Sequence, residues 1–496
     1  MMKKLLCVLL AALMLVGTLA SCATGGEGED TTASGTQNDS NAESETRETL
    51  DIPDTRYDGM ELCFLTRDED EWSTLEIFAD NQTSESDNIS NAVFERNDRI
   101  LQTYGVTITE LKKTTGEHHG SITNEVAAPT GDFQAVVTNT VNSASFATNG
   151  FLWNLNADEI EFMDFEKPWW DTNMAKGMSI DDRLYFATGD LLTSDNDATF
   201  VIMFNKQIVK DCNIPDLYAL VENNEWTMDK FYEYEQLAVQ DKNGDGKLSY
   251  DSDIAGLAYT SDVPYCMLFG GGVTMCTKDE TDTPIYDLDV ELAQNIADKG
   301  QLIFSKDLTV DLNNPGDGSN VLDAGKKAFG ENHALFMGEV MQCVTRMRGY
   351  DVDFGILPYP MYSEQQGNYF SMMHLTASSV SIPKSVSGND LVMVNSMIEA
   401  MAYHAMDTLT EQYYEINLKT KGAKDEQSGP MIDKILSNRA CDLSYYYQWG
   451  SNAFGSLASC LLPSGTKGVA SQNKKFKASI ERSIAQLEKA MAKFDQ

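Results

Sequence analysis

The sequence predicts an α/β protein with two lobes, each holding a mostly parallel sheet flanked by helices. Three observations lead to this prediction. The chain has 496 residues, and a single hydrophobic core rarely grows beyond roughly 250–300 residues. Short apolar runs alternate with amphipathic segments, as in parallel sheets covered by helices. The alternation begins near residue 58 and is repeated from residue 183.

The first 21 residues have the form of a secretion signal. Two lysines precede the apolar run "LLCVLLAALMLVGTLA". This run is shorter than the roughly 20 residues that a membrane-spanning helix needs. The run ends in Leu19-Ala20-Ser21-Cys22, which resembles the lipobox of bacterial lipoproteins. The resemblance implies cleavage before Cys22 and a lipid on that cysteine, which would anchor the chain at the extracellular face of the cytoplasmic membrane. An ordinary cleaved signal is the alternative.

Residues 22–54 are expected to comprise the lipidated cysteine and a disordered acidic tether. The stretch "ATGGEGEDTTASGTQNDSNAESETRETL" has almost no large apolar side chains. Such a segment cannot bury enough surface to offset the entropy lost on ordering.

The first lobe begins with three predicted strands and one helix. "MELCFLT" and "DFQAVVTN" are short apolar runs, and "NAVFERNDRILQTYGVTITEL" indicates a helix followed by a strand. In parallel sheets, ligands bind beyond the carboxyl ends of the strands. The loops "RDEDEWS" and "TNTVNSASFATNGFLWNL" are therefore the first places to look for ligand contacts. His118 and His119 are expected in a solvated loop.

The second lobe repeats this order and ends in a long helix. Residues 183–211 contain two apolar runs and a helix start, and residues 224–240 form an amphipathic helix with Thr227 as a plausible N-cap. Residues 474–494 place a set of apolar side chains on one helical stripe. They are Phe476, Ile480, Ile484, Leu487, Met491 and Phe494.

The charge and the cysteines exclude several classes of protein. A net charge of −39 argues against binding duplex nucleic acid or a polybasic attachment to membranes. Seven cysteines remain after Cys7 and Cys22, without CxxC or zinc-ligand spacing. We expect mostly buried free thiols, with a Cys266–Cys276 bridge as a weaker alternative.

The segment "DKNGDGKLSYDSD" resembles an EF-hand calcium loop in its first half. Asx side chains alternate, a glycine follows at position 6, and Ser252 occupies position 12, where a bidentate Glu is usual. No exiting helix or second loop is apparent. A structural calcium brace and a metal-free Asx-rich turn both stay open. The candidate ligands are Asp241, Asn243, Asp245, Lys247 through its carbonyl, Ser249 and Asp251.

Several stretches together resemble one family. They are, in order, "AVFERNDRILQTYGVTI", "NGFLWNLN", "KPWWDTNM", "LYFATGD", "FNK", "WTMDKFYEYEQLAVQDKNGDG", "GKKAFGENHALFMGE", "DFGILPYP" and "SSVSIPKSVSGND". The set resembles the carbohydrate-type extracellular solute-binding proteins of ABC importers, the group that includes maltose-binding protein. The chain departs from the family in "MGEVMQC", which lacks the Trp often found there.

The resemblance implies the type II periplasmic-binding-protein-like fold. Two hinge-linked lobes would hold the ligand between them, with residues 55–195 plus 361–405 in lobe 1 and residues 196–360 plus 406–496 in lobe 2. The chain would cross between lobes near residues 190–200, 357–362 and 403–410. The resemblance also implies a monomeric, non-enzymatic receptor that delivers a sugar to ABC permease subunits. It implies no cofactor other than the structural calcium ion considered above.

Sugar binding needs aromatic faces and planar polar side chains. The candidate ligand contacts are Asp70, Glu71, Trp72, Asn139, Trp169, Trp170, Asp190, Asp442 and Trp449. Trp153 and Trp226 are expected in the core. A surface-anchored glycoside hydrolase, a calcium-braced adhesion module, and a receptor for a peptide or another polar solute are the alternatives. No GxSxG, HExxH or Walker A motif is present.

Overall fold

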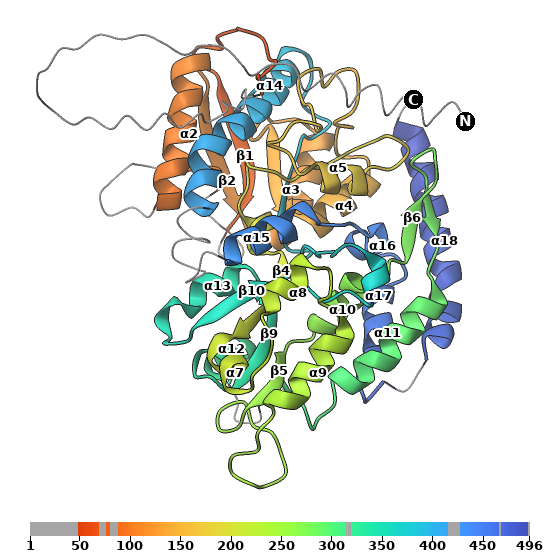
Figure 1. Ribbon diagram of the computed structural model, residues 1–496. Coiled ribbons are helices and arrows are strands. Elements are labelled where there is room, and N and C mark those ends of the chain that lie inside the picture. The colour runs from red at the N-terminus through yellow and green to blue at the C-terminus, as the bar shows by residue number, and fades with distance from the viewer. Residues whose placement is uncertain are drawn as a thin grey trace, which may run out of the picture. The chain divides into compact units, whose positions relative to one another are not determined.

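The computed structural model describes residues 48–68, 76–79, 88–313, 315, 319–414, 427–465 and 468–494. Residues Glu48–Gln496 form one compact unit, whose strands build two larger sheets and a hairpin (Figure 1). Cys22 and the predicted ligand contacts Asp70, Glu71 and Trp72 lie outside the described residues. No helix in the described ranges has the length and apolarity needed to cross a membrane.

Sheet 1 is mostly parallel, as predicted. Strand β1 pairs in parallel with β2 and β3, and β11 pairs antiparallel with β3. Both faces of β1 are buried, so its sequence ELCFLTR is a nearly continuous apolar run. In spatial order, the strands are β11 (Ser378–Ser381), β3 (Ala135–Asn139), β1 (Glu61–Arg67) and β2 (Thr107–Lys113).

Four helices contact sheet 1 or one another around it. They are α2 (Asn88–Tyr104), α3 (Thr115–Ala127), α4 (Thr140–Thr148) and α14 (Gly388–Ala405). Helices α2 and α14 pack side by side (Figure 1). Helix α2 ends before Gly105, whose φ of +75° favours glycine. A Cβ at Gly105 would lie 2.4 Å from Oδ1 of Asp58, so no larger residue fits there.

Sheet 2 is mixed, which corrects the prediction of a mostly parallel sheet. Strand β5 is parallel to β8 and β9, whereas β4 is antiparallel to β9 and β10. The chain enters sheet 2 at the end where β9 finishes. Phe200, the first residue of β4, pairs with Val340, the last residue of β9, so β4 and β9 run in opposite directions. In spatial order, the strands are β10 (Phe354–Leu357), β4 (Phe200–Asn205), β9 (Ala334–Val340), β5 (Ala255–Tyr259) and β8 (Thr309–Asp311).

The helices between the strands of sheet 2 are mostly short. They are α7 (Lys206–Asp211), α8 (Leu217–Glu222), α9 (Met228–Ala238), α10 (Val263–Gly270), α11 (Val290–Ile303), α12 (Val321–Gly330) and α13 (Gln342–Arg346). Thr227 precedes α9 as predicted, although its side chain makes no capping hydrogen bond. The hairpin of β6 (Cys276–Lys278) and β7 (Pro284–Tyr286) lies between α10 and α11 in the chain.

The remaining described elements connect these parts. They are α5 (Thr172–Met178), α6 (Ser194–Asp197), η1 (Met347–Gly349), η2 (Glu364–Gln366), the π-helical turn η3 (Met406–Thr410), α15 (Ser428–Ser437), α16 (Leu443–Tyr446), α17 (Ala453–Ala458), η5 (Ser459–Leu461) and α18 (Val469–Phe494). The predicted stripe on α18 is confirmed from Phe476 to Met491, because its five members in that range are buried.

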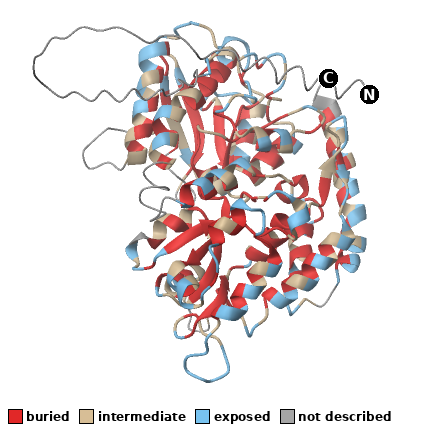
Figure 2. Cartoon of the chain, viewed as in Figure 1, coloured by how far each residue is buried: buried red, intermediate tan, exposed pale blue. Residues whose placement is uncertain are grey.

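The core follows the strands of both sheets (Figure 2). All seven described cysteines are free, which corrects the suggested Cys266–Cys276 bridge. Trp226 is fully buried, as predicted, and Trp153 is partly buried. His118 corrects another prediction: it lies in α3, is fully buried, and binds Oγ1 of Thr138 and the carbonyl oxygen of Thr66.

Ile480→Ala should lower the free energy of unfolding by about 2–5 kcal/mol, since it leaves a cavity under α18. Ile480 is 0% exposed. Urea unfolding followed by circular dichroism measures the change. The matched control is Gln486→Ala on the exposed face of the same helix, which should change the free energy by less than about 0.5 kcal/mol. Equal effects of the two substitutions would contradict the packing of α18.

Candidate functional site

Three chain segments run side by side where the two sheets meet. They are residues 193–200, 370–378 and 437–443, which we call the junction segments. Thr199 and Met373 form an antiparallel bridge, and Ser371 and Arg439 form a parallel one. The chain leaves sheet 2 through β10 and enters sheet 1 at β11 after passing through the second segment. Any ligand contacting both sheets would therefore lie near these segments.

The carboxyl ends of strands from both sheets meet the junction segments. Strand β3 ends at Asn139, opposite Ser378 at the start of β11. Strand β9 ends opposite the start of β4, and β5 runs in the same direction as β9. Ligands of open α/β sheets bind beyond such ends, so the junction is the candidate functional site.

Sheet 1 contributes Arg67 and Thr140 to the junction. Arg67 is 5% exposed, and its guanidinium donates to the carbonyl oxygen of Thr376 at 3.0 Å and to Oγ of Ser378 at 2.8 Å. Thr140 donates through Oγ1 to the carbonyl oxygen of Leu375 at 2.7 Å. These bonds fix the second junction segment against the ends of β1 and β3.

Sheet 2 contributes Asp262, which interacts electrostatically with His374 of the second junction segment. Burial raises the pKa of Asp262, and the His374 charge opposes this. Burial lowers the pKa of His374, and the Asp262 charge opposes that change in turn. Nδ1 of His374 lies 2.6 Å from Oγ1 of Thr376, and the imidazole packs edge-on against Phe200. An acid that follows β5 and an imidazole in the second junction segment could both hydrogen-bond to hydroxyl groups.

Aromatic side chains surround this pair. Tyr265 and Tyr445 each pack against Phe454, with ring centroids 6.0 and 5.9 Å away. Tyr445 hydrogen-bonds to the backbone of Leu375, and Tyr446 donates to the carbonyl oxygen of Met373 at 2.8 Å. Sequence reasoning singled out Trp449 from "LSYYYQWG" and missed these tyrosines, although the aromatic run itself was the available signal.

A cavity of about 430 Å³ borders the first and third junction segments. It brings together two predicted contacts that are 20 positions apart in the chain, Trp170 and Asp190, through a bridge between Trp170 and Gly189. The other lining residues are Pro168, Asp171, Thr172, Asn173, Asp195, Asn196, Thr410, Tyr414, Asp433, Leu436, Ser437 and Arg439.

Two acids of this cavity have pKa values of about 7. Burial raises the pKa of Asp190 to about 7, while the hydrogen bond from Thr410 works in the opposite direction. Burial likewise raises the pKa of Asp195 to about 7, although the Arg439 cation opposes the rise. The negative charges of Asp195 and Asp171 further raise the pKa of Asp190.

The positive charge of Arg439 offsets the charges of two buried carboxylates in the cavity wall, those of Asp171 and Asp195. Its Nε lies 2.9 Å from Oδ2 of Asp171, and Nη1 lies 3.3 Å from Oδ2 of Asp195. Burial opposes the cation, but the two carboxylates outweigh it and the pKa of Arg439 is raised. We take Asp171 as the principal ion partner of Arg439. The Arg439–Asp171 contact is shorter than the Arg439–Asp195 contact, and the pKa of Asp195 is about 7.

The tandem indoles Trp169 and Trp170 share one carboxylate. Each Nε1 donates at 2.8 Å to a different oxygen of Glu399 on α14. Trp169 is fully buried and meets Tyr403 edge-on. Burial raises the pKa of Glu399 to about 7, while the two indole bonds oppose the rise. Trp169 thus has a core position, whereas Trp170 also lines the cavity.

The other described candidates have structural contacts. Asn139 caps α4 by accepting the backbone N–H of Asn142 at 2.8 Å. Asp442 is fully buried and accepts from the backbone N–H groups of Met275 and Ser444 at 2.5 and 2.8 Å. Trp449 is 6% exposed. The predicted loop after β3 begins as α4, so Asn139 acts there as a helix cap.

The predicted calcium loop closes through its own backbone. Asp241 accepts the N–H groups of Gly244 and Gly246 at 2.7 and 2.8 Å. Asn243 and Asp245 each accept the N–H two positions on, as in Asx turns. Ser249 donates to Asp251, which also pairs with Lys327, while the carbonyl of Lys247 remains a predicted ligand. No three His, Cys, Asp or Glu side chains among the described residues are grouped to hold a metal.

The chain matches no protein-family model and no curated protein. Its fold does match solved structures. The sugar-binding protein MalE from Xanthomonas citri aligns with 88% of this chain and 100% of its own, with a TM-score of 0.57 and 11% identity. The maltose/maltodextrin-binding domain MalE from Bdellovibrio bacteriovorus, bound to maltotriose, aligns with 86% and 100%, with a TM-score of 0.51 and 14% identity.

An ABC substrate-binding protein from Listeria monocytogenes, in complex with cycloalternan, aligns with 88% of this chain and 100% of its own, with a TM-score of 0.52 and 10% identity. Likeness at these identities demonstrates a shared fold. The predicted periplasmic-binding-protein-like fold is therefore confirmed.

Asp190→Asn should reduce the loss of stability that accompanies rising pH. Because the pKa of Asp190 is about 7 in the folded chain and about 3.9 when unfolded, the folded state binds more protons and loses stability as pH rises from about 4 through 7. Asparagine does not titrate. We expect the variant to lose roughly 1–3 kcal/mol less between pH 5 and pH 8, as measured by urea unfolding. Asp307→Asn, at an exposed position, should follow the wild type; identical pH profiles of all three proteins would contradict the assignment.

If the loop at residues 241–251 holds calcium, addition of a chelator should lower the melting temperature of the wild type, because a cation that binds only the folded state stabilises it. Asp241→Ala should melt lower and should not respond to calcium or chelator. Differential scanning calorimetry in calcium and in chelator measures this. Equal wild-type melting temperatures in both buffers would favour the metal-free turn.

Proposed function

We propose that the chain is an extracellular receptor that captures a sugar or oligosaccharide and delivers it to the permease subunits of an ABC importer. The observation that carries the proposal is the structural match, which spans 85–88% of this chain and 98–100% of three sugar-binding neighbours. The Listeria and Bdellovibrio proteins hold cycloalternan and maltotriose, and the third neighbour, the GacH receptor of Streptomyces glaucescens, holds acarbose.

In this proposal the ligand lies at the junction, beyond the strand ends. Asp262 and His374 would bind hydroxyl groups, and Tyr265 would offer an aromatic face to the C–H patches of a sugar ring. The buried pairing of the junction segments would then serve as the pivot for closure of the two parts. Lipid attachment at Cys22 and residues 23–54 as a tether belong to the same proposal and rest on the sequence.

The direct test is a thermal-shift screen of the purified protein against mono- and oligosaccharides. A ligand that binds only the folded state raises the melting temperature. Recovery of unchanged sugar after incubation would support a receptor, whereas release of product would support the glycoside hydrolase alternative. If no saccharide raises the melting temperature, the proposal fails, and peptides and other polar solutes become the next ligands to test.

For a sugar found in that screen, His374→Ala should weaken binding about tenfold or more, because it removes a polar contact at the strand ends. Isothermal titration calorimetry measures the dissociation constant, with the melting temperature as a check on folding. The matched control is His119→Ala, at an exposed position on α3, which should bind like the wild type. Unchanged affinity of a folded His374→Ala variant would place the ligand elsewhere.

A further inference from the structure

The β6–β7 hairpin makes a polar contact with residues 176–183 beside the third junction segment, whose Cys441 contacts Met178 and whose Asp442 accepts from the N–H of Cys276. The two partners belong to different parts of the fold. Residues 180–187 are tied to sheet 1, because Ala187 forms a bridge with Val380 of β11. The hairpin connects α10 and α11, which follow β5 and precede β8 of sheet 2. This contact therefore joins elements of sheet 1 to elements of sheet 2 at the outer edge of the junction.

Lys278 is the centre of the contact. Its ammonium donates to the carbonyl oxygen of Lys176 at 2.5 Å, to Oγ of Ser179 at 2.9 Å and to Oδ1 of Asp282 at 2.9 Å. An ammonium has three donors, so the contact uses all of them. Two acceptors lie across the contact and the third lies in the hairpin itself, so this cation links the two partners.

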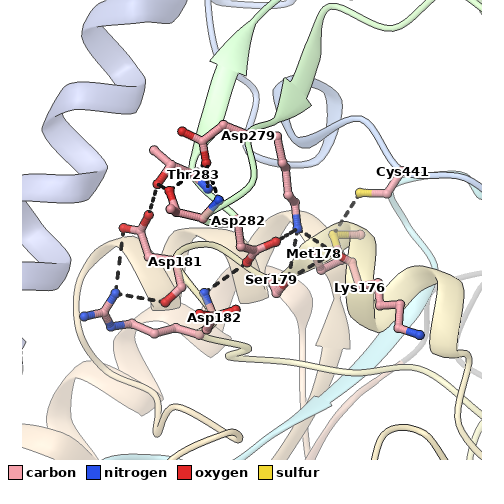
Figure 3. Close-up of polar contacts among 12 residues, drawn as sticks. Lys176, Met178, Ser179, Asp181, Asp182, Asp279, Asp282, Thr283 and Cys441 are labelled. Carbon is pink, nitrogen blue, oxygen red and sulfur yellow. Dashed lines mark hydrogen bonds and ion pairs between the residues drawn. The ribbon is translucent and has the colours of Figure 1, made fainter.

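Backbone and side-chain groups of Asp181, Asp182, Asp282 and Thr283 complete the contact (Figure 3). The N–H of Asp181 donates to the carbonyl oxygen of Asp282 at 3.0 Å, and the N–H of Asp182 donates to Oδ2 of Asp282 at 3.0 Å. Thr283 donates through Oγ1 to Oδ1 of Asp181 at 2.6 Å. Within the hairpin turn, Asp279 accepts from Thr283 and so holds the turn in shape.

Three aspartates of the contact have left-handed backbone conformations. The φ angles are 50° at Asp181, 61° at Asp182 and 59° at Asp282. Glycine adopts this region most easily, and aspartate tolerates it better than most residues. At Asp181 and Asp282 the carboxylates are used as acceptors across the contact, a role glycine could not fill. The chain thus adopts left-handed backbone at residues whose carboxylates complete the contact.

The contact is polar and lies at the solvent edge. Asp182, Asp279 and Thr281 are exposed, and Lys278 and Asp282 are each about one-fifth exposed, at 18% and 20%. Hydrogen bonds at such an edge exchange readily with water, because water can replace either partner. Opening at this edge breaks hydrogen bonds that water can replace.

We propose that residues 176–183 and the hairpin turn 278–283 form a clasp that holds the sheet 1 and sheet 2 parts together and opens when they separate. Its consequence for ligand retention rests on the proposed function, but its opening does not. Lys278 acts as the link, because it donates to two acceptors across the contact. Loss of the clasp should increase the population of the open form.

The first test measures the clasp in the ligand-free protein. In Lys278→Met, the amides of Asp181 and Asp182 should exchange hydrogen at least about tenfold faster than in the wild type, because their acceptors move away. Small-angle X-ray scattering should show a larger radius of gyration. Thr283→Val, which removes one cross-contact bond at nearly constant shape, should give a smaller change of the same sign. Lys306→Met, an exposed lysine between α11 and β8, is the matched control and should behave like the wild type.

Unchanged exchange in both clasp variants would overturn the proposal, and so would faster exchange with an unchanged radius of gyration, which indicates local loosening only. The second arm uses a sugar identified by the thermal-shift screen. There Lys278→Met should weaken the apparent affinity about threefold to tenfold, because less of the protein occupies the closed form. If no sugar binds but the scattering changes, the proposed function fails and the clasp stands. If a sugar binds and neither exchange nor scattering changes, the clasp fails alone.

Discussion

The buried guanidinium of Arg439, held between Asp171 and Asp195, is the interaction on which the arrangement of the two sheets depends. Asp171 begins α5 on the sheet 1 side, Asp195 lies in the first junction segment, and Arg439 lies in the third. Arg439 also pairs through its backbone with Ser371 of the second segment. Removing one partner of such a buried pair leaves an uncompensated charge, which costs about 3–5 kcal/mol. Arg439 therefore links the third segment to the other two, which also pair directly through Thr199 and Met373.

Several acids of this chain, whose net charge is −39, lie inside the fold, where N–H donors contact them. Glu76 accepts the backbone N–H of Thr193 at 2.8 Å, Asp442 accepts two further N–H groups, and Glu399 accepts two indoles. Glu235 is different: it is fully buried, and neither carboxylate oxygen has a hydrogen-bond partner in the structure. Burial raises the pKa of Glu235 well above its usual value.

The two-part architecture gives the junction and the clasp complementary roles. At the junction, backbone pairing and buried charges fix where the sheets meet, and strand ends bring Asp262 and His374 into one place. At the clasp, Lys278 and Asp282 make contacts that water can replace. In the proposed receptor, which must both retain and release a ligand, the junction would be the fixed pivot and the clasp the separable contact.

The sequence alone determined the type and order of the main elements, because these depend on local periodicity. Leu62–Leu65 form a continuous apolar run that only a strand covered on both faces accommodates, and the stripe from Phe476 to Met491 repeats with the helical period. From these patterns the α/β class follows, whereas the two lobes were predicted from the chain length and from the family resemblance. The position of Thr227 at the start of α9 likewise depends on the local sequence.

Only the tertiary structure decided what each polar or aromatic side chain does. Trp169 and Trp170 are neighbours with nearly the same local sequence, yet only Trp170 reaches the cavity. Their shared partner Glu399 lies about 230 positions away, and the His118 partner Thr138 lies on another element. Local periodicity specifies which face of an element is apolar. The partner of a buried charge is specified by which segments the fold brings together, and that information is spread over the whole chain.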